Sequence, residues 1–165
     1  MPSVFLVKIS KKSSITPNHF YFYIYFMKLK YFLSWLPGIV IAIGNGSLRQ
    51  FVYNLFFDEL EAHQLSALSF ILFFGIYVWL ILPWLKLSST AEAIRVGVFW
   101  LTVTIVFEFI FGHFIMGHPW EKLLHDYNFL NGRLWVIVLL WTTISPYLLF
   151  RLKSSTVSSP SKHVI

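Results

Sequence analysis

The 165-residue chain is 57% hydrophobic and only 12% charged, a balance that excludes an ordinary water-soluble globular domain and is typical of an integral membrane protein. The absence of cysteine excludes a disulfide framework, a zinc–thiolate site, an iron–sulfur cluster and a catalytic thiol. The net charge of +6 would suggest a nucleic-acid partner in a soluble protein. In a membrane protein, the distribution of Lys and Arg between the loops on the two sides of the membrane is considered first.

The first 26 residues differ in composition from the rest of the chain. Residues 8–14 are polar and residues 19–26 are almost entirely aromatic, and neither stretch could cross about 30 Å of hydrocarbon. Met27 and the lysines that follow it form an ordinary start with a positive flank. We therefore interpret residues 1–26 either as an extension upstream of the true start or as an interfacial segment, followed by a membrane domain at residues 27–153.

Four apolar runs are long enough to span a bilayer as helices at about 1.5 Å per residue. They cover residues 31–48, 65–85, 96–117 and 134–150. The first run is the shortest, and its Gly44-Asn45-Gly46 sequence indicates an outer end that is either unwound or closely packed. The fourth contains Pro146, which predicts a kink near its last turns. The predicted fold is all-α, with four transmembrane helices.

Both loops on the second side of the predicted membrane have apolar residues at helical spacing. In the longer loop these residues are Trp120, Leu123, Leu124 and Tyr127. In the loop after the first span they form a looser stripe of Val52, Leu55, Phe56 and Leu60. The pattern predicts two amphipathic helices that lie in the extracytoplasmic headgroup region.

The distribution of Lys and Arg predicts the orientation of the chain. Ten of the 13 basic residues fall in both termini and in the turn at residues 86–95, against one acid, Glu92. The other side has three basic and five acidic residues. The positive-inside rule therefore predicts a multi-pass protein of the bacterial inner membrane, with both termini cytoplasmic and residues 154–165 as a disordered tail. Topology and contact with anionic lipid explain the net charge, and nucleic acid is not a predicted partner.

Glu108 is the most informative residue, because a carboxylate inside a membrane span is energetically costly and suggests a function. It lies thirteen residues after Arg95, about 20 Å along the helix and toward the outer face. A small and polar stripe on the same helix, predicted to face the bundle interior, comprises Gly97, Leu101, Thr104, Glu108 and Gly112. Glu108 is either a protonatable or cation-binding group or part of a structural ion pair, and Arg49 and Arg133 are its predicted partners.

Histidines and further acids gather at the same outer boundary. Imidazole and carboxylate could ligate a metal or haem, although His113 and His118 share no helix face unless the helix breaks at Gly117. A quinone pocket among Trp120, Tyr127 and Trp135 is a further alternative. The chain contains neither a G-x-S-x-G elbow nor an H-E-x-x-H helix, so we expect a protein that is not an enzyme and carries no cofactor.

Short motifs follow one another in a fixed order between Met27 and Lys153. They are Asn45-Gly46 with Arg49, residues 62–66, residues 107–109 with Gly112-His113, residues 117–121, Leu124, residues 126–128 and residues 132–135. In these motifs the chain resembles a group of small bacterial membrane proteins with no assigned activity. The resemblance implies the same membrane architecture and the same set of polar residues, and it implies no reaction.

The sequence therefore predicts one polar network in the outer half of the bundle. Its members are Arg49, His63, Glu108, His113, His118, Glu121, Asp126 and Arg133. This network would bind a small cation or a lipid headgroup, or would stabilise the bundle. A haem- or quinone-binding redox accessory subunit and a small proton-coupled transporter are the alternatives. The predicted partners are the lipid bilayer and a homo-oligomer or larger membrane complex.

Overall fold

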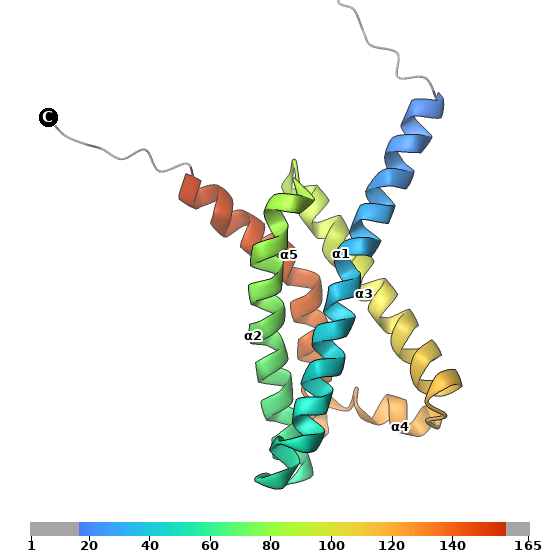
Figure 1. Cartoon of the computed structure of the whole chain (residues 1–165), viewed down its shortest axis with the longest axis vertical. Helices are drawn as coiled ribbons and strands as arrows, with labels where there is room; N and C mark the ends of the chain where they lie inside the picture. The colour runs from blue at the N-terminus through green and yellow to red at the C-terminus, as the bar shows by residue number, and fades with distance from the viewer. Residues whose placement is uncertain (1–16, 158–165) are drawn as a thin grey trace, which may run out of the picture.

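The computed structural model describes residues 17–157 of the chain and the side chains of residues 29–155. Its four long helices are α1 (Pro17–Phe51), α2 (Glu59–Leu85), α3 (Thr90–Ile110) and α5 (Trp135–Val157), shown in Figure 1. A π-helical turn, η2 (Phe111–Ile115), continues α3 and leads to the short helix α4 (Trp120–His125). The two 3₁₀ turns are η1 (Tyr53–Leu55) and η3 (Phe129–Asn131).

The prediction of an all-α fold with four membrane-length helices is confirmed. The segments that are long and apolar enough to cross a membrane are Leu29–Leu55, Glu59–Leu85, Thr90–Ile115 and Trp135–Ser155. Two of the helices begin earlier than hydropathy predicts, because polar side chains cap them. Asp58 accepts a hydrogen bond from the Glu61 backbone at 2.9 Å, and the Ser89 hydroxyl accepts one from the Glu92 backbone at 3.2 Å.

Helix α1 is continuous through Gly44 and Gly46, so the unwound alternative for its end is wrong. The closely packed alternative holds for Asn45 alone, since an added Cβ at Gly44 or Gly46 would meet nothing within 4 Å. Asn45 is buried, and its amide nitrogen donates to the backbone and side-chain oxygens of Ser66, both at 2.8 Å. The Ser69 hydroxyl donates to the Asn45 amide oxygen at 2.7 Å. These bonds join α1 to α2 and explain why an asparagine lies inside a membrane span.

Replacing Asn45 with alanine is expected to lower the free energy of unfolding by about 1–2 kcal/mol, because three interhelical hydrogen bonds are lost. Unfolding in mixed detergent micelles, followed by circular dichroism, measures the change. Ser47→Ala is the matched control, since Ser47 is exposed and bonds only to Ile43 on its own helix. Equal stability of the two variants would contradict the proposed strength of the α1–α2 contact.

The structure describes part of each end of the chain. Residues 17–26 are helical and belong to α1, while residues 1–16 lie outside the described part. The predicted tail begins too early, since α5 continues to Val157. The Ser154 and Ser155 hydroxyls bond to carbonyls one turn back, which satisfies them within the helix. Residues 158–165 lie outside the description.

The kink predicted at Pro146 concerns helix α5. Pro146 is inside α5, and Figure 1 shows the C-terminal half of this helix turning to one side.

The two loop segments take different structures. Residues 52–60 form the η1 turn and the start of α2 instead of a separate amphipathic helix, because the Asp58 cap begins α2 within the predicted stripe. Leu55 and Phe56 in this turn are 73% and 76% exposed. In the longer loop, α4 covers residues 120–125 and buries Leu123 against Gly112.

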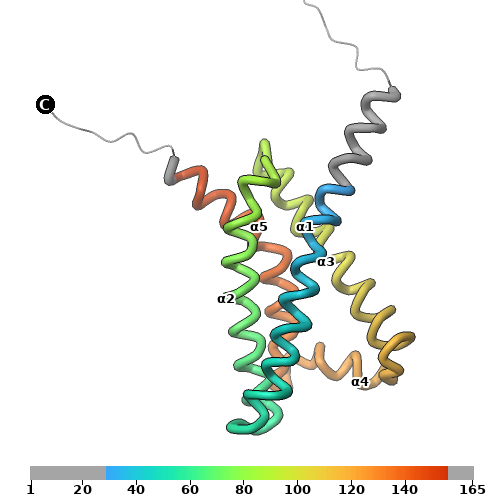
Figure 2. The backbone as a smooth tube through the Cα atoms, viewed as in Figure 1, coloured from blue at the N-terminus to red at the C-terminus, as the bar shows by residue number. Residues whose placement is uncertain are grey.

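The helices pack as two contacting pairs, α1 with α2 and α3 with α5, and α2 also lies against α5. At Gly97 the backbones of α3 and α5 approach so closely that an added Cβ would lie 1.9 Å from the Thr143 carbonyl oxygen. The Trp100 indole of α3 donates to the Tyr31 carbonyl of α1 at 3.0 Å. Beyond this crossing α1 and α3 diverge, and α4 lies across the open end (Figures 1 and 2).

Candidate functional site

The eight polar residues singled out from the sequence all lie at one end of the bundle. Here α1 ends, α2 begins, α3 passes into η2 and α5 begins, and we call it the α4 end. The opposite end holds the turn between α2 and α3. The hydrogen bonds and ion pairs at the α4 end form separate groups instead of the single network that was predicted.

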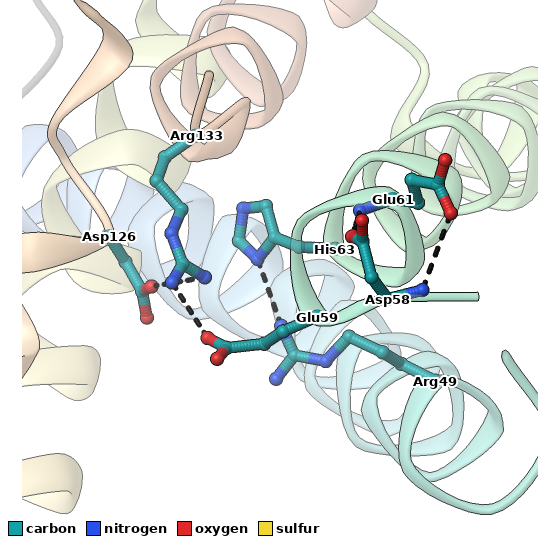
Figure 3. A network of polar contacts seen from close by, with 7 residues as sticks. All are labelled: Arg49, Asp58, Glu59, Glu61, His63, Asp126 and Arg133. Atoms are coloured by element: carbon teal, nitrogen blue, oxygen red, sulfur yellow. Dashed lines mark hydrogen bonds and ion pairs between the residues drawn. The ribbon is translucent and has the colours of Figure 1, made fainter. Parts of the chain in front are cut away.

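The first group is an ion pair around Arg133. Its guanidinium contacts the Glu59 carboxylate at 2.7 Å and the Asp126 carboxylate at 3.6 Å (Figure 3). The Arg133 side chain is 12% exposed, whereas the Glu59 side chain is 81% exposed. The group therefore lies at the surface, where it joins the start of α2 to the segment that precedes α5, and its carboxylates already neutralise Arg133.

The second group pairs Arg49 with His63 (Figure 3). The Arg49 guanidinium lies 3.0 Å from His63 Nδ1, and because a guanidinium can only donate, Nδ1 must accept and the ring proton is on Nε2. His63 is a buried residue at the start of α2. Its neutral ring thus positions Arg49 without neutralising it.

The third group centres on Glu108. Its Oε2 accepts a hydrogen bond from the Tyr127 hydroxyl at 2.6 Å and from the Trp135 indole at 3.0 Å. The predicted ion pairs of Glu108 with Arg49 and Arg133 are therefore wrong: neutral donors from the α4–α5 segment reach the carboxylate, and both arginines bond elsewhere. Burial, and then the bond to Glu108, raise the pKa of Tyr127, so that its hydroxyl stays a donor.

The interior-facing stripe on α3 is confirmed at the positions whose contacts are described. Thr104 accepts a hydrogen bond from the Trp35 indole at 2.9 Å. Gly97 meets α5, Gly112 meets Leu123, and Glu108 bonds to Tyr127 and Trp135. Spacing alone was thus sufficient to identify the face of α3 that contacts protein.

The histidines of the loop do not converge on a common ligand position. Gly117 has a φ of +67° and the helix breaks there, as the metal hypothesis required. However, His113 Nδ1 then donates to the His118 carbonyl at 2.9 Å, and the His113 ring stacks on Trp120 at 4.0 Å between centroids. Among the described residues, no group of three His, Asp or Glu side chains could hold a metal ion. Glu121 is exposed in the first turn of α4.

A cavity of about 440 Å³ lies between the diverging helices α1 and α3, and residues of α2 and α5 also line it. Its wall is mostly apolar and aromatic, and includes Trp35, Phe74, Phe107 and Trp135. Three ionisable side chains also line it: Arg49, Glu108 and His118. A smaller cavity of about 140 Å³ adjoins it, shares Ala42 and Arg49 with it, and is lined by His63. Of the three aromatic residues in the quinone hypothesis, only Trp135 lines the large cavity.

Two of the ionisable groups on the cavity wall, Arg49 and Glu108, form no ion pair with each other. The ion pairs of the described residues involve Arg133, Glu59 and Asp126, and they include neither Arg49 nor Glu108. A cation without a carboxylate partner and a carboxylate without a cationic partner therefore line the same apolar cavity. Such an arrangement leaves both groups available to a ligand.

Two features of the structure were missed from the sequence. The cavity itself has no sequence signal, since it depends on the angle between α1 and α3. The second is Glu92, a buried carboxylate at the opposite end of the bundle, which accepts from Tyr31 at 2.9 Å and from the Ser88 hydroxyl at 2.7 Å. The Ser89-to-Glu92 spacing is typical of a helix cap and would have identified it.

Comparison of the chain with protein-family models, with curated proteins and with solved structures finds no match. A functional conclusion therefore depends on the geometry and chemistry of the site.

Proposed function

We propose that the chain is a lipid-binding, non-enzymatic integral membrane protein of the bacterial inner membrane, which holds one lipid between α1 and α3. The observation that supports this most strongly is the cavity, whose wall is apolar from Trp35 onward and carries ionisable groups toward the α4 end. Its volume of about 440 Å³ falls within the range of about 300–1,000 Å³ for ligand pockets. An acyl chain suits the apolar part, and a headgroup suits the charged end.

A lipid headgroup suits the site better than a small cation. Hard cations take about six or more oxygen ligands, or keep several waters. Among the described residues that line the cavity, Glu108 is the only carboxylate, and its Oε2 already accepts two hydrogen bonds. Arg49 on the same wall would repel a bare cation. The apolar remainder of the wall would also contribute nothing to cation binding.

The proposed orientation places the α4 end outside. Lys30, Lys86, Arg95 and Lys153 lie at or near the opposite end of the helices, which supports a cytoplasmic position for that end and for both termini. In this orientation η1 and α4 lie in the extracytoplasmic headgroup region. The exposure of apolar side chains there supports the assignment, and Leu130 between α4 and α5 is 94% exposed.

A bulky side chain inside the cavity is expected to expel the lipid. Ala42→Phe adds a ring at a residue that lines both cavities, whereas Val40→Phe adds one on the same helix at a position that is 70% exposed. Native mass spectrometry of the full chain in mild detergent should show a lipid-mass adduct on the wild type and on Val40→Phe. The adduct should be about tenfold weaker on Ala42→Phe.

The same spectrum distinguishes the alternatives. A wild-type protein that carries no lipid under conditions that preserve its fold would overturn the proposed function. An adduct of haem mass, accompanied by a Soret band, would support the redox accessory subunit instead. Equal lipid retention by Ala42→Phe and Val40→Phe would place the lipid on the outer surface of the helices and outside the cavity.

A further inference from the structure

The chemistry of the headgroup can be inferred from the two charges on the cavity wall. Arg49 uses one nitrogen of its guanidinium to bond to neutral His63 at 3.0 Å, and no carboxylate among the described side chains pairs with it. Its remaining N–H groups can donate to an anionic group in the cavity. Guanidinium groups commonly hold phosphate through two parallel hydrogen bonds, and phosphate is the anion that most membrane lipids carry.

Glu108 suits a group of the opposite kind, a cationic hydrogen-bond donor. Tyr127 and Trp135 both donate to Oε2, so that Oε1 remains to accept from a ligand. A primary ammonium group is the complementary cation, because it brings both a positive charge and N–H donors.

One ligand can satisfy both groups, because both line the same cavity and they do not pair with each other. A purely anionic headgroup would neutralise Arg49 but would place a negative charge near Glu108. A cationic headgroup would do the reverse, and each case leaves one partly buried group without a partner of opposite charge, which is unfavourable. A zwitterionic headgroup leaves neither charge unpaired.

We infer that the bound lipid carries a phosphate and a primary ammonium, as phosphatidylethanolamine does, with the phosphate against Arg49 and the ammonium against Glu108. This inference depends on the proposed lipid-binding function. His63 acts as a positioning residue, since its Nδ1 holds the Arg49 guanidinium at the cavity wall. Arg49 and Glu108 on the same cavity wall thus set the headgroup preference, and the apolar wall accommodates an acyl chain.

The test is a competition between three lipids of identical acyl chains. The purified full chain is incubated in mild detergent with equal amounts of phosphatidylethanolamine, phosphatidylglycerol and diacylglycerol, and the adducts are measured by native mass spectrometry. We expect phosphatidylethanolamine to exceed phosphatidylglycerol about tenfold, and diacylglycerol to be bound least.

Two variants separate the two contacts. Glu108→Gln keeps an oxygen that can accept from Tyr127 and Trp135 but removes the charge, so phospholipid binding should persist while the preference for ethanolamine is lost. Arg49→Gln should reduce the adducts of both phospholipids to the level of the diacylglycerol adduct. Glu121→Gln and Lys122→Gln are the matched controls, because neither residue lines the large cavity. Arg49→Lys, which keeps the charge, should weaken the binding of both phospholipids equally. This variant replaces Arg49→Gln in the test if Arg49→Gln fails to fold.

The outcomes for the headgroup and for lipid binding itself are distinct. Equal binding of phosphatidylethanolamine and phosphatidylglycerol by the wild type, or an unchanged preference in Glu108→Gln, would overturn the headgroup inference and leave the proposed function standing. Retention of none of the three lipids by the folded wild type would overturn both.

Discussion

A single methyl group added at Gly97 is expected to force α3 and α5 apart. An alanine Cβ at this position would lie 1.9 Å from the Thr143 carbonyl oxygen and 2.9 Å from its carbon. Both are backbone atoms, so no side-chain rotation can relieve the clash. Overpacking of this kind costs about 1–3 kcal/mol and more where the backbone must move, so Gly97→Ala should lower the free energy of unfolding by at least about 3 kcal/mol. Unfolding in mixed detergent micelles measures the effect.

Gly44→Ala is the control for this substitution. Gly44 is also helical and lies in a membrane-length segment, but an added Cβ there meets nothing within 4 Å. Because alanine favours helix over glycine by up to about 1 kcal/mol, Gly44→Ala should leave stability unchanged or raise it slightly. If the two variants unfolded alike, the close approach of α3 and α5 would be contradicted.

The long helices and the interior face of α3 could be predicted because each depends on a repeating local signal. Apolar length identified the four spans, and the spacing of Gly97, Thr104 and Glu108 identified the side of α3 that meets other helices. Both signals follow from the rise and period of a single helix. The location of the polar residues at one end of the bundle follows from the same order of spans.

The partners of Glu108 could not be predicted from charge. Coulomb attraction selects Arg49 and Arg133, but the energy of a buried carboxylate is also lowered by neutral donors, and Tyr127 and Trp135 are placed by the turn between α4 and α5. Arg133 meets Glu59 instead, because α2 begins earlier than hydropathy indicates. One misplaced helix start therefore changed the predicted partner of an arginine.

The cavity could not be predicted for a related reason. Its volume depends on how far α1 and α3 diverge beyond the crossing at Tyr31 and Trp100, and the angle between two helices is set by contacts between them. A hydropathy pattern describes one helix at a time. The individual residues of the site were thus identified from the sequence, while the space between them and the separation of their charges were not.

Loss of the indole at Trp100 is expected to weaken the crossing from which the cavity opens. Trp100 is 0% exposed, donates to the Tyr31 carbonyl at 3.0 Å and meets the edge of the Phe74 ring at 5.7 Å between centroids. Inside a bilayer, packing and hydrogen bonds hold helices together more than burial from water does. Replacing a buried tryptophan by alanine typically costs about 3–5 kcal/mol, and Trp100→Ala should fall in this range when its unfolding is measured in detergent.

Two comparisons identify what Trp100 contributes. Trp100→Phe keeps most of the ring contact and loses the bond to Tyr31, so its stability should lie between those of the wild type and Trp100→Ala. Trp84→Ala removes an indole that is 48% exposed on α2, and we expect a loss of less than about 1 kcal/mol. Because the crossing fixes where α1 and α3 begin to diverge, Trp100→Ala should also weaken binding of the proposed lipid, whereas Trp84→Ala should leave it unchanged. A Trp100→Ala protein that stays folded and keeps its lipid would show that the shape of the cavity depends on contacts other than this crossing.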